Sequence, residues 1–337
     1  MPPKVSVVMP VYNGERYLQL AIDSIRNQTF TDFELIIVDD ASKDGTWPLL
    51  MANAQQDARI VLVRNVQNAG EAGARNRGLL EVRGTYVAVQ DCDDISFPQR
   101  LALQVAYLDA HPEVGAIGTP AQRIDAAGNP TSIWQVPAGH EMIRAQLIFT
   151  SPLPHTTMMA RQSLLKQLKG YATDIFTTDY DLWWRLSQVS RLETLPQPLA
   201  QYRSAPDPGR ITTGQAPRQL LGSQEMSLRI LGEIMQGQRL DVEAYKRFFA
   251  CMRNQPDALL AGDVTRLQSL WDFLAADPHY RAAAGPRLLS TALKITRRHP
   301  ADALKLLRIT QAQFGISTKE IVRKYLRVYV REPLSRA

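Results

Sequence analysis

The chain has 337 residues, 45% of them hydrophobic, and a formal net charge of +6. This length and composition suit one or two globular domains and exclude wholesale disorder. Residues 294–337 carry eleven Lys and Arg against three Asp and Glu, so the remaining residues carry −2. The basic character therefore belongs to the tail, and we expect no nucleic-acid partner for the main domain.

The cysteine count and the terminus indicate a compartment. Cys92 and Cys251 are the only cysteines and lie far apart in the sequence, so we expect no disulfide and no zinc site. The first predicted strand starts almost at the N-terminus, which leaves no room for a signal peptide. No apolar stretch approaches the roughly 20 residues of a membrane-spanning helix. We expect a cytoplasmic protein that is soluble or peripheral at a membrane.

The first 118 residues alternate between strand and helix patterns. Helices are predicted after the first four strands, the first of them with Tyr17, Leu18, Ala21, Ile22 and Ile25 on one face. Such alternation is typical of an α/β fold, in which a mostly parallel sheet carries helices on both faces. The strands are predicted at 5–9, 34–38, 60–64, 85–89 and 114–118.

From about residue 122 the alternation breaks. Gly128-Asn129-Pro130 predicts a hairpin turn, and 155–160 predicts an extended segment. Short helices are predicted at 141–147, 163–169 and 180–187. A stretch rich in proline ends near residue 210, where we place a domain boundary. Beyond it, residues 211–337 are predicted to be helical throughout.

The last predicted helix is amphipathic. Its basic arc contains Lys319, Arg323, Lys324, Arg327 and Arg331, and its other arc is mainly apolar. A helix of this kind can bind an anionic membrane surface. The alternative is that its apolar arc packs against the protein's own helices. The apolar arc comprises Ile321, Val322, Tyr325, Leu326, Val328 and Tyr329.

Carboxylates follow two of the predicted strands. Asp91, Asp93 and Asp94 come after the strand at 85–89, and Asp39 and Asp40 come after the strand at 34–38. Ligands of open parallel sheets bind beyond the carboxyl ends of the strands, so both groups should face one crevice. Clustered carboxylates repel one another unless a cation such as Mg²⁺ or Mn²⁺ joins them. An acidic turn that caps the next helix is the alternative.

Several segments, in order along the chain, resemble the inverting family 2 glycosyltransferases. They span residues 4–204, about 60% of the chain, and imply a GT-A fold with a nucleotide-sugar-binding half at 1–118 and an acceptor-binding half at 119–210. The resemblance lies in VSVVMPVYNG at 5–14, SIRNQTF at 24–30, FELIIVDDASKDGT at 33–46, NAGEAGARNRG at 68–78, DCDD at 91–94 and TDYDLWWRL at 178–186.

The resemblance implies roles on the donor side. Asp93 would be the main ligand of Mn²⁺ or Mg²⁺, and Asp91 would face the ribose and the metal. Asp40 would accept a hydrogen bond from uracil N3–H, with Asp39 as the alternative. Arg75 would reach the nucleotide or its phosphates, or else form a surface ion pair. Pro10 and Tyr12 would line the base and ribose pocket. Asp94 is expected to cap the next helix or to support the metal ligands.

The acceptor side needs a general base, which the resemblance assigns to Asp179. Relatives often have Glu-Asp where this chain has Thr178-Asp179, so a supporting carboxylate is missing. Asp181 is the competing candidate. Either Trp183 or Trp184 could stack on a sugar, although both could equally be core. His155 borders the predicted acceptor region.

These features predict an inverting, metal-dependent glycosyltransferase. It would move a sugar from a nucleoside diphosphate sugar, with UDP expected, to a saccharide or lipid-linked saccharide acceptor in polysaccharide or glycoconjugate synthesis. A sugar-nucleotide nucleotidyltransferase and a non-catalytic nucleotide-sugar-binding scaffold are the alternatives. The first would be expected to carry a Gly-rich loop with a Lys after the first strand, where this chain has Pro10-Val11-Tyr12-Asn13-Gly14.

Overall fold

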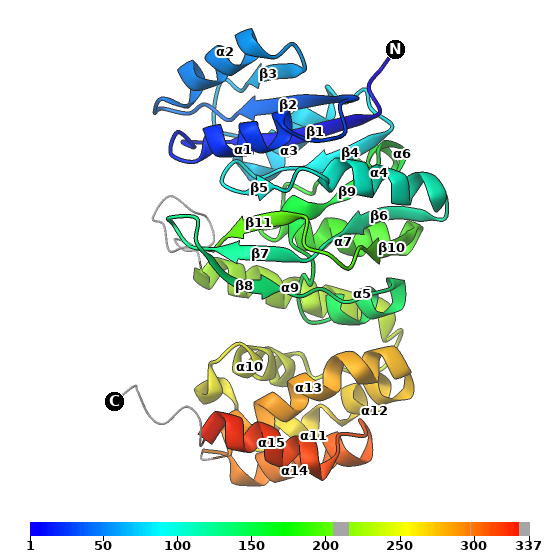
Figure 1. The fold of residues 1–337 in the computed structure, drawn as a ribbon. Coiled ribbons are helices and arrows are strands. Elements are labelled where there is room, and N and C mark those ends of the chain that lie inside the picture. The colour runs from blue at the N-terminus through cyan, green and yellow to red at the C-terminus, as the bar shows by residue number, and fades with distance from the viewer. Residues whose placement is uncertain (205–215, 297, 330–337) are drawn as a thin grey trace. The chain divides into compact units, whose positions relative to one another are not determined.

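The computed structural model describes residues 1–204, 216–296 and 298–329 (Figure 1). The chain divides into two compact units. The first contains residues 1–147 and 151–219, and the second contains residues 148–150 and 220–337. The compact units divide after residues 147, 150 and 219, and the predicted boundary near residue 210 falls within 205–215, which lie outside the described residues.

A seven-stranded sheet forms the centre of the first unit, in the order β10-β6-β9-β4-β1-β2-β3. The pairs β1–β2, β2–β3, β1–β4 and β6–β10 are parallel, which confirms the predicted α/β fold. β9 runs antiparallel to both of its neighbours, β4 and β6. The strands are β1 (Val5–Val11), β2 (Phe33–Asp39), β3 (Ile60–Arg64), β4 (Tyr86–Val89), β6 (Val114–Gly118), β9 (Met159–Arg161) and β10 (Arg191–Thr194).

One predicted element is wrong in detail. The segment at 155–160 was expected to be extended throughout, but a 3-10 turn, η1 (His155–Thr157), precedes the short β9. The side chains of this turn are buried, and the Thr157 hydroxyl donates to the carbonyl of Pro154 at 2.8 Å. β9 and β10 come from the second predicted half, so the two halves share one sheet.

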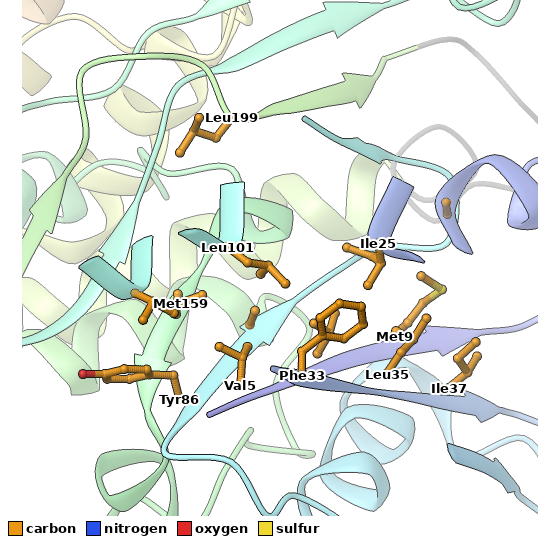
Figure 2. Close-up of a cluster of buried hydrophobic side chains, with 14 of the residues drawn as sticks. Val5, Met9, Ile25, Phe33, Leu35, Ile37, Tyr86, Leu101, Met159 and Leu199 are labelled. Carbon is orange, nitrogen blue, oxygen red and sulfur yellow. The ribbon is translucent and has the colours of Figure 1, made fainter. Parts of the chain in front are cut away.

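The two faces of the sheet follow the two-residue period of its strands. The odd-numbered residues of β1 and β2 pack with α1 (Leu18–Arg26) and α4 (Arg100–Ala110) in one hydrophobic cluster, part of which Figure 2 shows. α3 (Gly70–Leu79) covers the even-numbered residues, because a Cβ on Gly78 would lie 2.6 Å from Val8. α2 (Thr46–Gln56) packs beside β3.

A second sheet of four strands lies in the same unit, in the order β5-β11-β7-β8. β7 (Ala121–Ile124) and β8 (Pro130–Trp134) form the predicted hairpin, in which the Asp125 carboxylate accepts from the backbone of Ala127 and Asn129. β5 (Ile95–Ser96) and β11 (Ala200–Arg203) complete the sheet. The other helices of this unit are α5 (His140–Leu147), α6 (Gln162–Gln167) and α7 (Thr178–Val189).

The second unit is helical in its described part, as predicted. Phe248, Phe249 and Trp271 lie in its core, and the buried Asp263 accepts two hydrogen bonds of 2.8 Å from Arg247. No helix in the part of the chain that the structure describes is long and apolar enough to cross a membrane. The helices are α9 (Ala216–Ile234, in this unit from Leu220), α10 (Val242–Met252), η2 (Pro256–Ala258), α11 (Asp263–Arg266), α12 (Gln268–Ala276), α13 (Pro278–Ile295), α14 (Pro300–Ala312) and α15 (Thr318–Tyr329).

Candidate active site

The loop that follows β4 carries the acidic motif, and a buried glutamine shapes it. The Gln90 amide donates to the carbonyls of Asp91 and Asp94, at 3.0 and 2.9 Å. Its own oxygen accepts from Ser96 and from the buried Arg100. The sequence analysis assigned no role to Gln90 or Arg100. The position of a glutamine at the end of an apolar strand could have indicated that Gln90 has a structural role.

Arg203, on β11, also supports the acidic loop. Its backbone N–H donates to the Asp94 carboxylate at 2.8 Å, and its Nε donates to the Asp93 carbonyl at 3.0 Å. Its guanidinium lies 4.0 Å from the centre of the Tyr17 ring. Asp94 therefore anchors the second sheet to the loop, which fits its predicted supporting role rather than a helix cap.

Asp91 is held by Arg75. The Arg75 Nη2 donates to Asp91 Oδ1 at 2.8 Å, and its Nη1 pairs with Glu71 Oε1 at 2.7 Å. Only 2% of the Arg75 side chain is exposed, so this is not the surface ion pair considered above. Although burial acts to lower the pKa of Arg75, the Glu71 and Asp91 carboxylates raise it above its ordinary value. Arg75 thus lies in the candidate site as a permanent cation.

Asp40 is buried and holds the start of α3. Its Oδ1 accepts from Asn65 Nδ2 at 2.7 Å and from the Ala69 N–H at 2.8 Å, and its Oδ2 accepts from the Gly70 N–H at 2.9 Å. The next residue, Ala41, has φ of 62°, a left-handed conformation that costs an L-residue roughly 1–2 kcal/mol. Strain of this kind is often found at functional loops.

The other donor-side residues lie around the ends of β1 and β2. Tyr12 is 45% exposed just past β1, and Pro10 is half-buried within it. Asp39 pairs with Arg64 at 3.0 Å and accepts from the Ser42 N–H. A pocket of about 340 Å³ opens beside these residues, and its lining does not include Asp91, Asp93 or Asp179. It is lined by Ala41, Ser42, Arg64, Asn65 and Val66.

Asp179 lies in the first turn of α7 and is half-buried. Burial raises the pKa of its carboxyl to about 6, with the nearby Glu71 carboxylate adding to the rise and Arg75 opposing it. Asp181 is fully buried instead, and its Oδ2 accepts from Arg185 Nε at 2.6 Å. Arg185 also donates to the carbonyls of Leu168 and Gly170. Of the two candidate bases, Asp181 is therefore the one whose carboxylate is already bound within the protein, where it supports the packing of α7.

Buried aromatic groups support this side of the site. The Tyr171 ring lies 5.4 Å from the Arg75 guanidinium carbon, and its hydroxyl lies 2.8 Å from His155 Nε2. Burial, aided by Arg75, holds the pKa of His155 well below its ordinary value, so His155 is neutral. Trp183 and Trp184 are both buried, which makes them core residues.

The donor set of the acidic loop fits a hard divalent cation. Among the described residues, no three His, Cys, Asp or Glu side chains gather to hold a metal by themselves. Mg²⁺ usually binds one or two carboxylates and completes its shell with water and substrate phosphates. Asp91 and Asp93 offer two carboxylates on one loop, which is the number and kind of protein ligands that Mg²⁺ usually takes.

Comparison with known proteins identifies the family of the chain. Residues 6–169 match the family described as Glycosyl transferase family 2. EpsE of Bacillus subtilis, named as a glycosyltransferase, is 39% identical over 54% of this chain and 66% of its own length. An uncharacterized glycosyltransferase of Methanocaldococcus jannaschii is 32% identical over 60% of this chain and 71% of its own length. The O-antigen biosynthesis glycosyltransferase WbnJ of Escherichia coli is 28% identical over 59% and 79%.

Solved structures share the fold. TarS 1-349 of S. aureus in complex with UDP-GlcNAc superposes with a TM-score of 0.60 at 20% identity, over 93% of this chain and 91% of that one. The mannosyltransferase PcManGT from Pyrobaculum calidifontis, in complex with GDP-Man and Mn²⁺, gives 0.55 at 21% identity, over 97% and 88%. The matched region spans about two thirds of EpsE. The chain belongs to glycosyltransferase family 2 and has a GT-A fold.

Proposed function

We propose that this protein is an inverting, metal-dependent glycosyltransferase that uses a UDP-sugar. The observation that carries the proposal is the gathering of Asp91, Arg75 and Glu71 near Asp179, because it brings a metal-ligand carboxylate and a base into one site. Family membership favours this activity over a nucleotidyltransferase or a scaffold, and the sequence carries Asp91, Asp93 and Asp179.

On the donor side, Asp91 and Asp93 would hold Mn²⁺ or Mg²⁺. When bound, the metal supplies positive charge to the leaving diphosphate. Arg75 keeps Asp91 in place through its 2.8 Å hydrogen bond. Pro10 and Tyr12 would line the base and ribose pocket. Gln90 and Arg203 fix the loop that carries both ligands, so little reorganisation is needed when the donor binds.

On the acceptor side, Asp179 would take the proton of the acceptor hydroxyl. The acceptor oxygen then attacks the anomeric carbon from the face opposite the diphosphate, and the C–O bond to the diphosphate breaks. The product is a β-linked sugar if the donor is an α-linked UDP-sugar. The raised pKa of Asp179 suits this residue to the role of base, because a base acts best when its pKa is near the working pH.

The expected donor is a UDP-sugar because a carboxylate accepts the N3–H of uracil. Asp40 would provide it, although three internal hydrogen bonds already use much of its accepting capacity. TarS was solved with UDP-GlcNAc and PcManGT with GDP-Man, so the fold accommodates both bases. The acceptor would be a saccharide, which is consistent with O-antigen synthesis by WbnJ.

A donor screen tests the proposal. Purified protein with Mn²⁺ is given UDP-, GDP- and ADP-sugars, first with water and then with candidate saccharide acceptors, and released nucleoside diphosphate is measured. We expect release from a UDP-sugar that is stimulated by an acceptor and lost in Asp179→Asn. Release that persists unchanged in that variant would contradict the assigned mechanism.

If the acceptor is carried on a lipid, the enzyme must reach a membrane surface, and we assign this contact to α15. Lys319 and Arg323 are exposed there, and Val322 is 51% exposed. Lys324 donates to the Pro286 carbonyl of α13. The side chains of Arg327 and Arg331 lie outside the described residues. Such contact would place the protein at the cytoplasmic face of a membrane.

Co-sedimentation with anionic vesicles tests the role of α15. Each Lys or Arg near an anionic surface contributes about 1 kcal/mol, and salt weakens the attraction. We expect the full chain to pellet at low salt, and a protein that ends at Ser317 to remain in solution. Equal pelleting of the two proteins would show that the helix only packs on its own unit.

A further inference from the structure

The Glu71–Arg75 pair of α3 differs from the Arg77–Glu81 pair at the C-terminal end of this helix. Both pairs have i,i+4 spacing, but Glu81 lies just beyond Leu79, the last residue of α3. Arg77 and Glu81, at the far end, are 41% and 37% exposed and form an ordinary surface pair. Arg75 is buried, and its guanidinium also binds Asp91. In the Glu71–Arg75 pair, Glu71 is therefore the partner that is exposed to solvent. Its carboxylate binds a guanidinium that is buried in the site.

Glu71 is not required to cap the helix. The Asp40 carboxylate already accepts from the Ala69 and Gly70 N–H groups at the start of α3. The terminal nitrogens of Arg75 are divided between Glu71 and Asp91, at 2.7 and 2.8 Å. Its Nε has no hydrogen-bond partner within the described residues. The guanidinium is thus committed to two carboxylates, neither of which is Asp179.

We propose that Glu71 is a positioning residue for the general base: it binds Arg75 and so prevents that guanidinium from pairing with Asp179. The inference rests on the proposed function, because it gives Asp179 the role of base. It also supplies from α3 a second carboxylate near Asp179, in a chain where Thr178 precedes the base.

The charges around Asp179 support this arrangement. Glu71 and Arg75 on α3, Asp91 after β4, and Tyr171 all lie close enough to Asp179 to interact with it electrostatically. His155, bonded to Tyr171, is neutral and adds no positive charge. Two carboxylates therefore share a single cation beside the base. Burial first, and then Glu71, raise the pKa of Asp179 to about 6.

The test compares Glu71→Gln with Glu81→Gln, which removes the same charge from the surface pair at the C-terminal end of α3. The readout is kcat/KM for sugar transfer between pH 4.5 and 8.5. Removing the Glu71 charge should lower the pKa of Asp179, and Arg75 then becomes free to pair with it. We expect the acid limb of the Glu71→Gln profile to move down by roughly half to one pH unit. We also expect transfer at pH 8 to slow several-fold, since a weaker base remains.

Controls separate this role from simple structural support. Glu81→Gln should keep the wild-type profile, and Glu71→Asp should restore most of it. Calorimetry of UDP with Mn²⁺ should give Kd values within about twofold for all variants. A uniform loss at every pH, or an unmoved acid limb in Glu71→Gln, would overturn the inference. If Asp179→Asn is inactive in the same assay, that failure would leave the proposed function intact.

Discussion

The carboxylates assigned to the donor side and to the acceptor side of the candidate site are held in opposite ways. Asp91 is bound to Arg75, and Asp40 accepts three hydrogen bonds from Asn65, Ala69 and Gly70. Asp179 instead lies half-buried among negative neighbours, and its pKa is raised. A carboxylate that must stay charged to hold a ligand benefits from such partners. A carboxylate that must accept a proton benefits from their absence, so the difference is consistent with the roles proposed for these residues.

The substitution Asp179→Asn tests this difference between the carboxylates most directly and is expected to have the largest effect. The change keeps the shape of the side chain but removes its basicity, and general-base catalysis contributes about 10²–10⁴ in rate. We expect a loss of that size in kcat with little change in donor affinity, measured by product formation and calorimetry. Because burial disfavours the charged form of Asp179, the variant should unfold at no lower a temperature than wild type at pH 8.

Asp181→Asn provides the control for this prediction. Asp181 is fully buried and paired with Arg185, so we expect Asp181→Asn to lower the melting temperature. In the fraction that remains folded, kcat should fall only slightly. An active Asp179→Asn together with an inactive, stably folded Asp181→Asn would move the base to residue 181.

The second prediction concerns the metal ligands. Asp93→Ala should lower kcat by roughly 10²–10³, the usual cost of losing one electrostatic stabiliser of the transition state. Asp32→Ala is the matched control, because Asp32 is an exposed carboxylate at the opposite, amino end of β2. Wild-type activity should disappear in excess EDTA and return with Mn²⁺ or Mg²⁺. Full turnover in EDTA would exclude the assigned metal role.

The third prediction separates two roles of Asp40. Asp40→Ala should lower the melting temperature, because the backbone donors at the start of α3 lose a charged acceptor. If Asp40 also binds uracil, UDP affinity should fall by roughly 1.5–3 kcal/mol while GDP affinity changes less. Calorimetry with both nucleotides distinguishes the roles. Equal losses for UDP and GDP would leave Asp40 with the structural role alone.

The smallest expected effect is the wild-type pH dependence. The proposed base, Asp179, would act as the anion, and its pKa is raised to about 6, so activity should be present above this pH and lost below it. We expect kcat/KM to be half-maximal near pH 6 and to fall about tenfold over each further pH unit. Donor affinity, measured over the same range, should change little. An acid limb of the kcat/KM profile at the ordinary pKa of an aspartate would contradict this prediction. It would mean that a nearby positive charge stabilises the charged form of the base.

The fold was most predictable where strands are continuous apolar runs. β3 and β6 have the predicted bounds, and α1 buries four of the five residues assigned to its apolar face. β5, β10 and β11 were not predicted, since strands of two to four residues give little local signal and depend on partners far away in sequence. Two buried tryptophans next to a candidate base were ambiguous because their pattern alone does not distinguish a sugar platform from a core.

The site was predictable in part for a similar reason. Asp91, Asp93 and Asp179 were assigned from motifs and stay predictions, and the i,i+4 spacing of Glu71 and Arg75 can be read directly. That Arg75 also binds Asp91 could not be read, because this contact depends on how α3 packs against the sheet. The three internal partners of Asp40 were hidden for the same reason, as they come from the β3–α3 connection.

The position of β9 has a consequence for how the chain folds during synthesis. β9 pairs with β4 on one side and with β6 on the other, yet about 70 residues separate the end of β4 from the end of β9. At roughly 5–20 residues per second, a growing chain would expose the open edge of β4 for several seconds. Unpaired edges invite aggregation, so the nucleotide-binding half should need chaperone protection until Arg161 has left the ribosome, and it should not fold as an isolated fragment.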